Sequence, residues 1–213
     1  MNSKPELRQM FRRLLEGEAS VDSSARSSEQ AVADLCERLV QNFKTHKIRK
    51  GRVWAAYQPA GFEADVRGAL KALPEVDWVF PRVVGDRIHF LRPHAPFQFS
   101  SNKWGILEPD PAHSDEVNLS EIDGLLIPAL AFDLQLNRLG RGKGYYDRAL
   151  AEISQLNPHV IKIGVALDLQ ISNDPFPAES FDVPMDLVIT EIRTLQPRSL
   201  AHPLESHTER KSS

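Results

Sequence analysis

A stretch rich in glycine and basic residues is the part of the sequence that points most directly to chemistry. Residues 138–148 read RLGRGKGYYDR, with glycines at alternate positions and cations between and beside them. Glycine lets the backbone approach a ligand closely and adopt a positive φ, and free N–H groups at the start of a helix attract anions. The stretch follows an apolar run and precedes a helical pattern. We therefore expect it to bind phosphate through its backbone and through Arg138, Arg141 and Lys143.

Two common phosphate-binding motifs do not match this stretch. A Walker loop needs Ser or Thr directly after its lysine, but Gly144 follows Lys143. A dinucleotide fingerprint needs a third glycine where Asp147 stands. From the residues alone, a flexible basic loop that closes a strand–helix connection remains the alternative to a phosphate site.

The elements around this loop predict its scaffold. Helical spacing of apolar residues predicts helices over 4–16, 29–47, 63–73 and 145–156. Strands are predicted over 52–57, 76–84, 86–91, 122–132, 160–167 and 186–190, with a tight turn at Gly85-Asp86 and a long loop over 93–120. Strands that alternate with helices indicate an α/β fold, a three-layer α/β/α arrangement with a largely parallel central sheet. We expect one domain over residues 1–195 and a disordered polar tail over 196–213, after a loop over 20–28.

Composition narrows the class of protein. The chain has 213 residues and a formal net charge of −3, which argues against a dedicated nucleic-acid binder. The single cysteine, Cys36, excludes an intrachain disulfide and lies in a helical apolar pattern, as expected of a buried structural thiol. No apolar run approaches the roughly 20 residues of a membrane span, and residues 1–13 lack the apolar stretch of a secretory signal. We expect a cytoplasmic, monomeric protein with a small-molecule substrate.

The loop also belongs to a larger pattern. The stretch PALAFD…RLGRGKGYYDR, residues 128–148, resembles the signature of 5-formyltetrahydrofolate cyclo-ligases, also called methenyltetrahydrofolate synthetases. Four other segments resemble the same family in the same order: KPELR at 4–8, FPR with IHF at 80–90, WGILEP at 104–109, and residues 182–191. The resemblance covers residues 4–191. One departure is Leu136, where the family usually has glycine. The sequence therefore does not predict the backbone shape of the turn that precedes the glycine-rich loop.

The resemblance implies an ATP- and Mg²⁺-dependent cyclisation of 5-formyltetrahydrofolate to 5,10-methenyltetrahydrofolate. By the resemblance, the nucleotide would contact Lys4, Arg8, Arg138, Gly140, Arg141, Gly142, Lys143, Gly144, Tyr145 and Tyr146. Lys143, Arg141 and Tyr146 would serve catalysis, and Asp147 and Asp182 would hold Mg²⁺, with Asp186 competing for the second position. From the residues alone, the alternative for Asp147 is a first-turn carboxylate that complements the helix dipole, and the alternative for Lys4 and Arg8 is a solvated helix face.

The folate side requires aromatic faces and a polar acceptor. The resemblance points to Trp104, Tyr145, Tyr146 and Phe90 for the pterin, and to Glu63 as an acceptor for its N–H groups. The alternative for Glu63 is an exposed carboxylate at a helix start. Trp54 and Trp78 lie within predicted strands and are expected in the core, whereas His89 is expected to point away from the apolar face of its strand.

Two other functions fit the loop without the resemblance. A non-catalytic sensor module for a phosphorylated metabolite would use a similar anion loop, and fold alone does not exclude it. Such a sensor would not need the metal-binding carboxylates Asp147 and Asp182, so these residues distinguish the two hypotheses. A transferase or isomerase acting on phosphorylated sugars or coenzyme A would require a catalytic Glu or Lys in a context that the sequence does not show.

Overall fold

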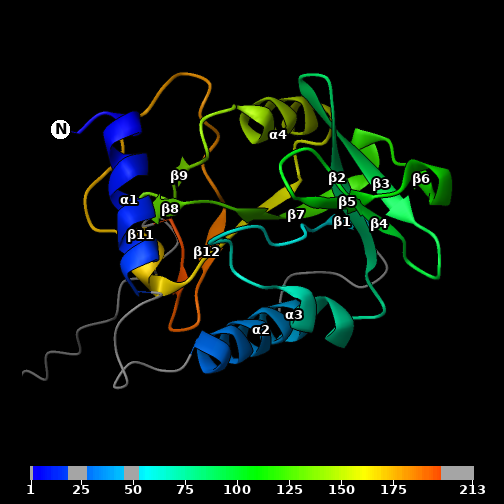
Figure 1. The fold of residues 1–213 in the computed structure, drawn as a ribbon, viewed down its shortest axis with the longest axis horizontal. Coiled ribbons are helices and arrows are strands. Elements are labelled where there is room, and N and C mark those ends of the chain that lie inside the picture. The colour runs from blue at the N-terminus through cyan, green and yellow to red at the C-terminus, as the bar shows by residue number, and fades with distance from the viewer. Residues whose placement is uncertain (1, 19–27, 46–52, 198–213) are drawn as a thin grey trace, which may run out of the picture.

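The computed structural model of the chain describes residues 2–18, 28–45 and 53–197. These residues form three layers, with helices on both faces of a central sheet (Figure 1). The sheet has eight strands in the order β13-β12-β10-β7-β1-β2-β3-β6. The predicted tail from residue 198 onward, and the predicted loop over residues 20–28 apart from Ser28, lie outside the described residues.

The middle of the sheet is parallel and its edges are antiparallel. The parallel strands are β12 (Leu187–Ile189), β10 (Ile161–Val165), β7 (Ile122–Pro128), β1 (Val53–Ala55) and β2 (Asp77–Val84). The antiparallel strands are β3 (Arg87–Pro93), β6 (Ser114–Glu116) and β13 (Thr194–Leu195). The apolar run of β7 is explained by its central place, because a strand covered on both faces buries nearly every side chain. The prediction of a three-layer α/β fold with a largely parallel sheet is confirmed.

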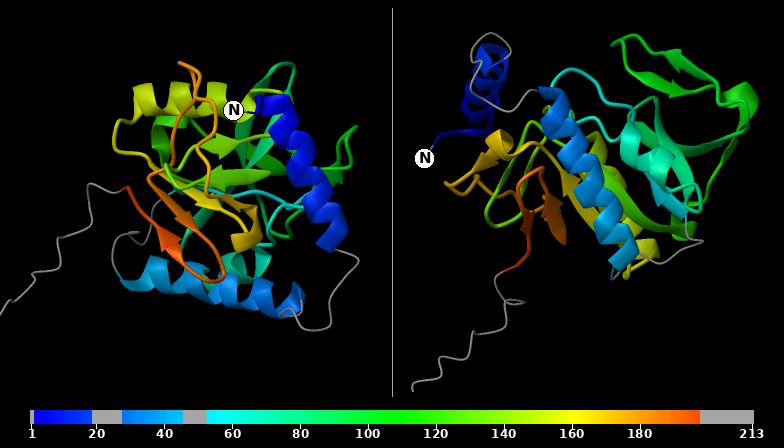
Figure 2. Two further views of the ribbon diagram at one scale, coloured as in Figure 1. Left: turned by 90° about the vertical axis from the view of Figure 1, so that its left-hand side faces the viewer. Right: turned by 90° about the horizontal axis from the view of Figure 1, so that it is seen from below.

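Helices α2 (Ser28–Thr45) and α4 (Tyr145–Leu156) lie on opposite faces of the central sheet, as Figure 2 shows. On one face, α2 packs Leu35, Leu39 and Phe43 around Trp54, with α3 (Arg67–Ala72) beside it. On the other face, α4 packs Leu150 and Ile153 into a second core cluster. Residues three or four apart share one helix face, and each fully buried aliphatic or aromatic side chain contributes about 1.5–3 kcal/mol.

Two small sheets complete the structure. One consists of β11 (Ile171–Ser172), β8 (Ala131–Asp133) and β9 (Arg138–Leu139), and α1 (Lys4–Glu18) packs against it. The other is a hairpin of β4 (Phe99–Ser101) and β5 (Leu107–Pro109). Short 3₁₀ turns lie at Pro111–His113, Leu119–Glu121 and Asp168–Gln170. No helix among the described residues has the length and apolar character needed to cross a membrane.

The structure corrects three predicted boundaries. The helix predicted over 63–73 starts only at Arg67, because Glu63 accepts the N–H of Ala60 and Asp65 accepts the N–H of Arg67, which favours turns instead. The apolar run 122–132 is not one strand, since β7 ends at Pro128 and β8 belongs to another sheet. The long loop over 93–120 contains β4, β5 and β6.

Candidate active site

A cavity of about 600 Å³ opens at the carboxyl ends of β1 and β7. Tyr57 and Gln58 follow β1 in its wall, and Pro128 and Ala129 mark the end of β7. Further walls come from α1, the glycine loop before α4, the β4–β5 hairpin, the β2–β3 pair and residues 179–182. The carboxyl edge of a parallel sheet is the usual ligand site of an α/β fold, so the structure presents the predicted loop where a ligand would bind.

The glycines of the loop are required by its geometry. Gly142 and Gly144 have φ values of 94° and 67°, in the region that favours glycine. Gly144 directly precedes α4, so the free N–H groups of the first helical turn lie next to the cavity. At Gly140, an added Cβ would lie 2.7 Å from the guanidinium of Arg138. A side chain at these positions would strain the loop or displace its cations.

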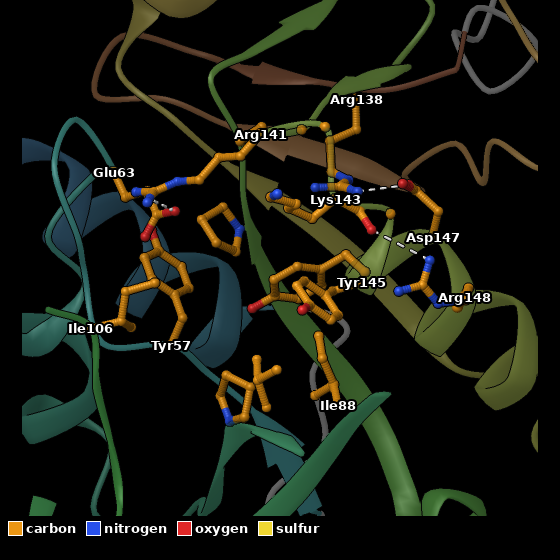
Figure 3. A pocket seen from close by; sticks show the side chains of 18 of the residues that line it. Tyr57, Glu63, Ile88, Ile106, Arg138, Arg141, Lys143, Tyr145, Asp147 and Arg148 are labelled. Atoms are coloured by element: carbon orange, nitrogen blue, oxygen red, sulfur yellow. Dashed lines mark hydrogen bonds and ion pairs between the residues drawn. The ribbon is translucent and has the colours of Figure 1, made fainter. Parts of the chain in front are cut away.

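The loop's cations line one side of the cavity (Figure 3). Arg138 is nearly buried and pairs with Asp147 at 2.6 Å, and its guanidinium lies 5.3 Å from the centre of the Tyr146 ring. Arg141 pairs with Glu63 at 3.0 Å. The ammonium group of Lys143 is exposed and has no hydrogen bond or ion pair within the described part of the chain. Lys143 is therefore free to meet an anionic ligand.

Helix α1 adds a row of cations beside the glycine loop, on the same side of the cavity. Lys4, Arg8 and Arg12 line the cavity one turn apart, about 6 Å along the helix axis. The Nε of Arg8 donates to the carbonyl of Gly140 at 2.9 Å, which joins the helix to the glycine loop. The sequence prediction placed Lys4 and Arg8 at the nucleotide but did not assign Arg12 to the site.

The predicted metal carboxylates lie on the cavity and are already paired. Asp182 contacts the ammonium of Lys4 at 2.7 Å, as Asp147 contacts Arg138. Burial lowers the pKa of Lys4, but the bonds and charges of Asp182 and Glu179 outweigh it, so the net shift is upward. Asp186 does not line the cavity and pairs with Lys162 at 3.0 Å. Among the described residues, no three His, Cys, Asp or Glu side chains form a ready metal site.

An apolar and aromatic region faces the cations. The Trp104 ring, on the β4–β5 hairpin, lies 6.3 Å from that of Tyr145. Ile88 and Ile106 also line the cavity (Figure 3). The hydroxyl of Tyr57 donates to the carbonyl of Ala64 at 2.7 Å. Phe90 does not line the cavity, contrary to expectation. It shares a strand face with Ile88, but it is 1% exposed and packs inside the core cluster beneath α4.

Two polar groups here have altered acidity. Glu63 is 14% exposed, so it is not the exposed helix carboxylate of the alternative prediction. Burial raises the pKa of Glu63, and the neighbouring Arg141 offsets only part of that rise. Burial likewise raises the pKa of the Tyr146 hydroxyl, so Tyr146 stays protonated at neutral pH.

Several cavity residues were not predicted from the sequence. Tyr57 follows β1 at the carboxyl edge of the sheet, a position that could have marked it. Arg148 belongs to the glycine-rich stretch itself, and its guanidinium lies 5.4 Å from the centre of the Tyr145 ring. Glu108 and Phe181 also line the cavity. Glu108 belongs to the WGILEP segment of the resemblance, which could have marked it, whereas Phe181 directly precedes the segment 182–191 and gives no signal of its own.

Comparison with known proteins agrees with this architecture. The profile of the 5-formyltetrahydrofolate cyclo-ligase family matches residues 1–191. A 5-formyltetrahydrofolate cyclo-ligase of Mycolicibacterium smegmatis is 33% identical over 153 residues, which are 67% of this chain and 75% of that protein. A protein named a probable 5-formyltetrahydrofolate cyclo-ligase from Schizosaccharomyces pombe is 30% identical over 129 residues, 54% of this chain and 62% of the relative. Other curated relatives are matched over 41% to 54% of their length.

A solved structure supports the same relationship over nearly the whole chain. The 5,10-methenyltetrahydrofolate synthetase of Aquifex aeolicus superimposes with a TM-score of 0.72 at 31% identity. The superposition covers 96% of this chain and 99% of that one. With the family profile matching residues 1–191, the chain belongs to the 5-formyltetrahydrofolate cyclo-ligase family.

Proposed function

We propose that this protein cyclises 5-formyltetrahydrofolate to 5,10-methenyltetrahydrofolate at the expense of ATP, releasing ADP and phosphate. Family membership supports the substrate and the product. The observation that carries the proposal is the arrangement of the cavity. A glycine loop and a row of helix cations on one side face aromatic side chains on the other, so one cavity offers a place for phosphates and a place for a pterin ring.

The chemistry explains why both places are needed. The oxygen of a formyl group is a poor leaving group. In the proposed reaction the oxygen attacks the γ-phosphorus of ATP, and ADP departs. N10 then attacks the activated formyl carbon and releases its proton to solvent or to the departing phosphate. The C–O bond breaks as phosphate leaves, and N5 and N10 share the positive charge of the methenyl product. Enzymatic phosphoryl transfer depends mainly on positioning and charge neutralisation, which cationic side chains and backbone N–H groups supply.

We assign the phosphate contacts to the loop and to α1. Lys143 has no partner among the described residues and would bind the transferred phosphate. Arg141 and Arg8 would bind the other phosphates of the nucleotide. Tyr146 stays protonated and can donate a hydrogen bond in the same region. The loop's backbone N–H groups would complete the set, because Gly142 and Gly144 hold them in a left-handed conformation.

The carboxylates fit a magnesium ion that arrives with the nucleotide. Mg²⁺ commonly takes one or two carboxylates together with phosphate oxygens, and Asp147 and Asp182 are the carboxylates that we assign to it. When bound, the ion neutralises charge on the phosphates. Both carboxylates now hold cations, Arg138 and Lys4. With the two carboxylates holding the ion, Arg138 and Lys4 would be available to bind the phosphates.

We assign the pterin to the aromatic region beside the hairpin. Trp104 and Tyr145 can stack on a flat ring, and Glu63, at the far side of Arg141, can accept hydrogen bonds from pterin N–H groups. We place the protein's activity in the cytoplasm, where reduced folates and ATP are both available to it.

The direct test is formation of the methenyl product. Purified protein is mixed with 5-formyltetrahydrofolate, Mg²⁺ and ATP, and the near-ultraviolet absorbance of the methenyl group is followed. We expect absorbance to grow only when all components are present, with one ADP formed for each product. Absence of growth beside an active control enzyme would contradict the proposal. ADP formation without the chromophore would show that the protein hydrolyses ATP without cyclising the folate, which would also contradict the proposal.

A further inference from the structure

The β4–β5 hairpin forms one wall of the cavity, yet its strands pair only with each other. It is a two-stranded sheet of its own, separate from the central sheet, and it projects beside the central sheet in Figure 2. Its tip brings Trp104, Ile106 and Leu107 to the cavity. Trp104 is 47% exposed, so core packing alone does not fix it. Some other contact must set the distance between this tip and the glycine loop.

The hairpin meets β2 through the ring contact of Phe80 with Phe99 and through Glu108, and Glu108 is the polar link that continues toward the tip. Its carboxylate is buried, with the residue only 5% exposed, and its Oε1 accepts two hydrogen bonds. One comes from the backbone N–H of Val83 in β2, at 3.1 Å. The other comes from the side-chain amide of Asn102, at 2.8 Å. A buried charge is stable only when it is bonded and compensated, and the guanidinium of Arg82 lies 3.9 Å from Oε2.

Asn102 carries the connection onward to the tip. Its Oδ1 accepts the backbone N–H groups of Trp104, at 2.9 Å, and of Ile106, at 3.1 Å. Its own N–H donates to the carbonyl of Ile106 at 2.8 Å. A continuous chain of hydrogen bonds thus runs from β2 through Glu108 and Asn102 to the backbone that bears Trp104. Each member is fixed at both ends, which is the arrangement that holds a binding surface in one geometry.

We infer that Glu108 and Asn102 are positioning residues that set the folate-binding wall of the cavity. They act through the placement of Trp104 and Ile106, and neither supplies a charge to the reaction. The inference rests on the proposed function for the identity of the ligand. It predicts that breaking the chain of hydrogen bonds weakens folate binding and leaves the nucleotide contacts of the glycine loop and α1 in place.

The test compares Glu108→Ala, Asn102→Ala and Glu108→Gln. Loss of one buried hydrogen-bonded link should raise the KM for 5-formyltetrahydrofolate about tenfold in both alanine variants, with the KM for ATP within about twofold. The Glu108→Gln variant keeps an oxygen that can accept both bonds, so its folate KM should stay within about threefold of the wild type. The double alanine variant should be no worse than the more severe single one, because both changes break the same link.

A second readout does not depend on turnover. Quenching of Trp104 by acrylamide, taken as the difference from Trp104→Phe forms of each variant, should increase in both alanine variants. Glu191→Ala is the matched control, because Glu191 is also buried and accepts a backbone N–H, from Asp168, but does not line the cavity. It should lower the unfolding temperature without moving the folate KM. If Glu108→Ala does not fold, Asn102→Ala decides alone.

The outcomes separate this inference from the proposed function. Wild-type protein without ATP-dependent product formation would defeat the proposed function. With an active wild type, equal rises in both KM values, or unchanged Trp104 quenching, would overturn the positioning role. A Glu108→Gln variant as impaired as Glu108→Ala would also overturn it, since the charge of Glu108 would then be acting directly.

Discussion

At the scale of single residues, the cations of the cavity differ in what they already bind. Arg138 and Arg141 are paired with Asp147 and Glu63, respectively, whereas the Lys143 ammonium has no partner among the described residues. A cation without an internal partner can give its full charge to a ligand. The difference assigns distinct roles to neighbouring residues of one short loop, with Arg138 and Arg141 held in place and Lys143 free to bind phosphate.

Replacing Lys143 by alanine should affect the nucleotide and spare the folate. A hydrogen bond to a charged group contributes about 1.5–3 kcal/mol, so the KM for ATP should rise about 10- to 100-fold. Folate binding, measured by equilibrium titration without ATP, should change by less than about twofold. Lys71→Ala, an exposed lysine on α3, is the control. Equal losses for ATP and folate would count against the role of Lys143.

The acidity of Glu63 gives a pH prediction. Burial raises its pKa in the folded protein, so it takes up a proton at a higher pH than an ordinary glutamate does. If the ionised carboxylate accepts pterin N–H groups, folate affinity should fall as the pH drops through this raised pKa. The Glu63→Gln variant should bind more weakly and lose this acid-side dependence. An unchanged acid limb in Glu63→Gln would show that another group titrates.

At the scale of elements, the turn between β8 and β9 contains an unusual residue. Leu136 has a φ of 66° although it is not glycine, and its side chain is 2% exposed. The buried carboxylate of Asp133 holds the turn by accepting the backbone N–H groups of Gln135 and Asn137. Here the backbone keeps a conformation suited to glycine while a leucine side chain fills the core.

At position 136 we expect the glycine variant to be more stable than the alanine variant, the reverse of the order at an ordinary buried position. Truncating a buried leucine costs about 2–5 kcal/mol, but glycine at position 136 also relieves the roughly 1–2 kcal/mol cost of a left-handed residue. Leu136→Gly should therefore be more stable than Leu136→Ala by about 1 kcal/mol in chemical denaturation. At Leu126, equally buried in β7, glycine should be worse than alanine. The same order at both positions would contradict the account.

The elements also show how far sequence reasoning reaches. The helix over 145–156 and the hairpin at Gly85-Asp86 were predicted correctly, because their signals are local: apolar spacing and a turn dipeptide. The start of α3 was missed because side-chain hydrogen bonds from Glu63 and Asp65 compete with the helix. The break at Pro128 was missed because an apolar run does not show where a chain leaves one sheet for another.

The candidate site was predictable to a similar extent. The glycine loop, Glu63, Trp104 and two cations of α1, Lys4 and Arg8, were identified, and the structure brings them to one cavity. The pairing of Lys4 with Asp182 joins residues 178 positions apart, and such a contact leaves no trace in local spacing. Phe90 was misplaced because the resemblance indicated that its strand runs beside the pocket but not which of the strand's residues reach it; Ile88 lines the cavity and Phe90 is buried in the core.

At the scale of the whole molecule, metal and nucleotide binding should be coupled. The ion pairs Lys4–Asp182 and Arg138–Asp147 link α1, the segment before β12 and the glycine loop. Mg²⁺ alone must break these pairs without providing a new anion for the cations. In calorimetric titrations we therefore expect no measurable binding of Mg²⁺ alone, and Mg-ATP should bind at least about tenfold more tightly than ATP without metal.

A variant tests the physical origin of this coupling. The Asp182→Asn variant leaves Lys4 without its carboxylate at that position, so ATP without Mg²⁺ should bind more tightly to it than to the wild type, and added Mg²⁺ should help less. The control is Asp186→Asn, which removes the carboxylate of a similar ion pair, with Lys162, outside the cavity. It should leave the binding of ATP and of Mg-ATP unchanged. Tight binding of Mg²⁺ to the wild type without nucleotide would contradict the predicted coupling.

The most direct measurement is a crystal structure with magnesium, a non-hydrolysable ATP analogue and 5-formyltetrahydrofolate. We predict the triphosphate along Gly140, Gly142 and Gly144, with the metal on Asp147 or Asp182 and the pterin ring against Trp104 or Tyr145. A nucleotide bound at another place, with residues 138–148 closed and free of ligand, would contradict the account.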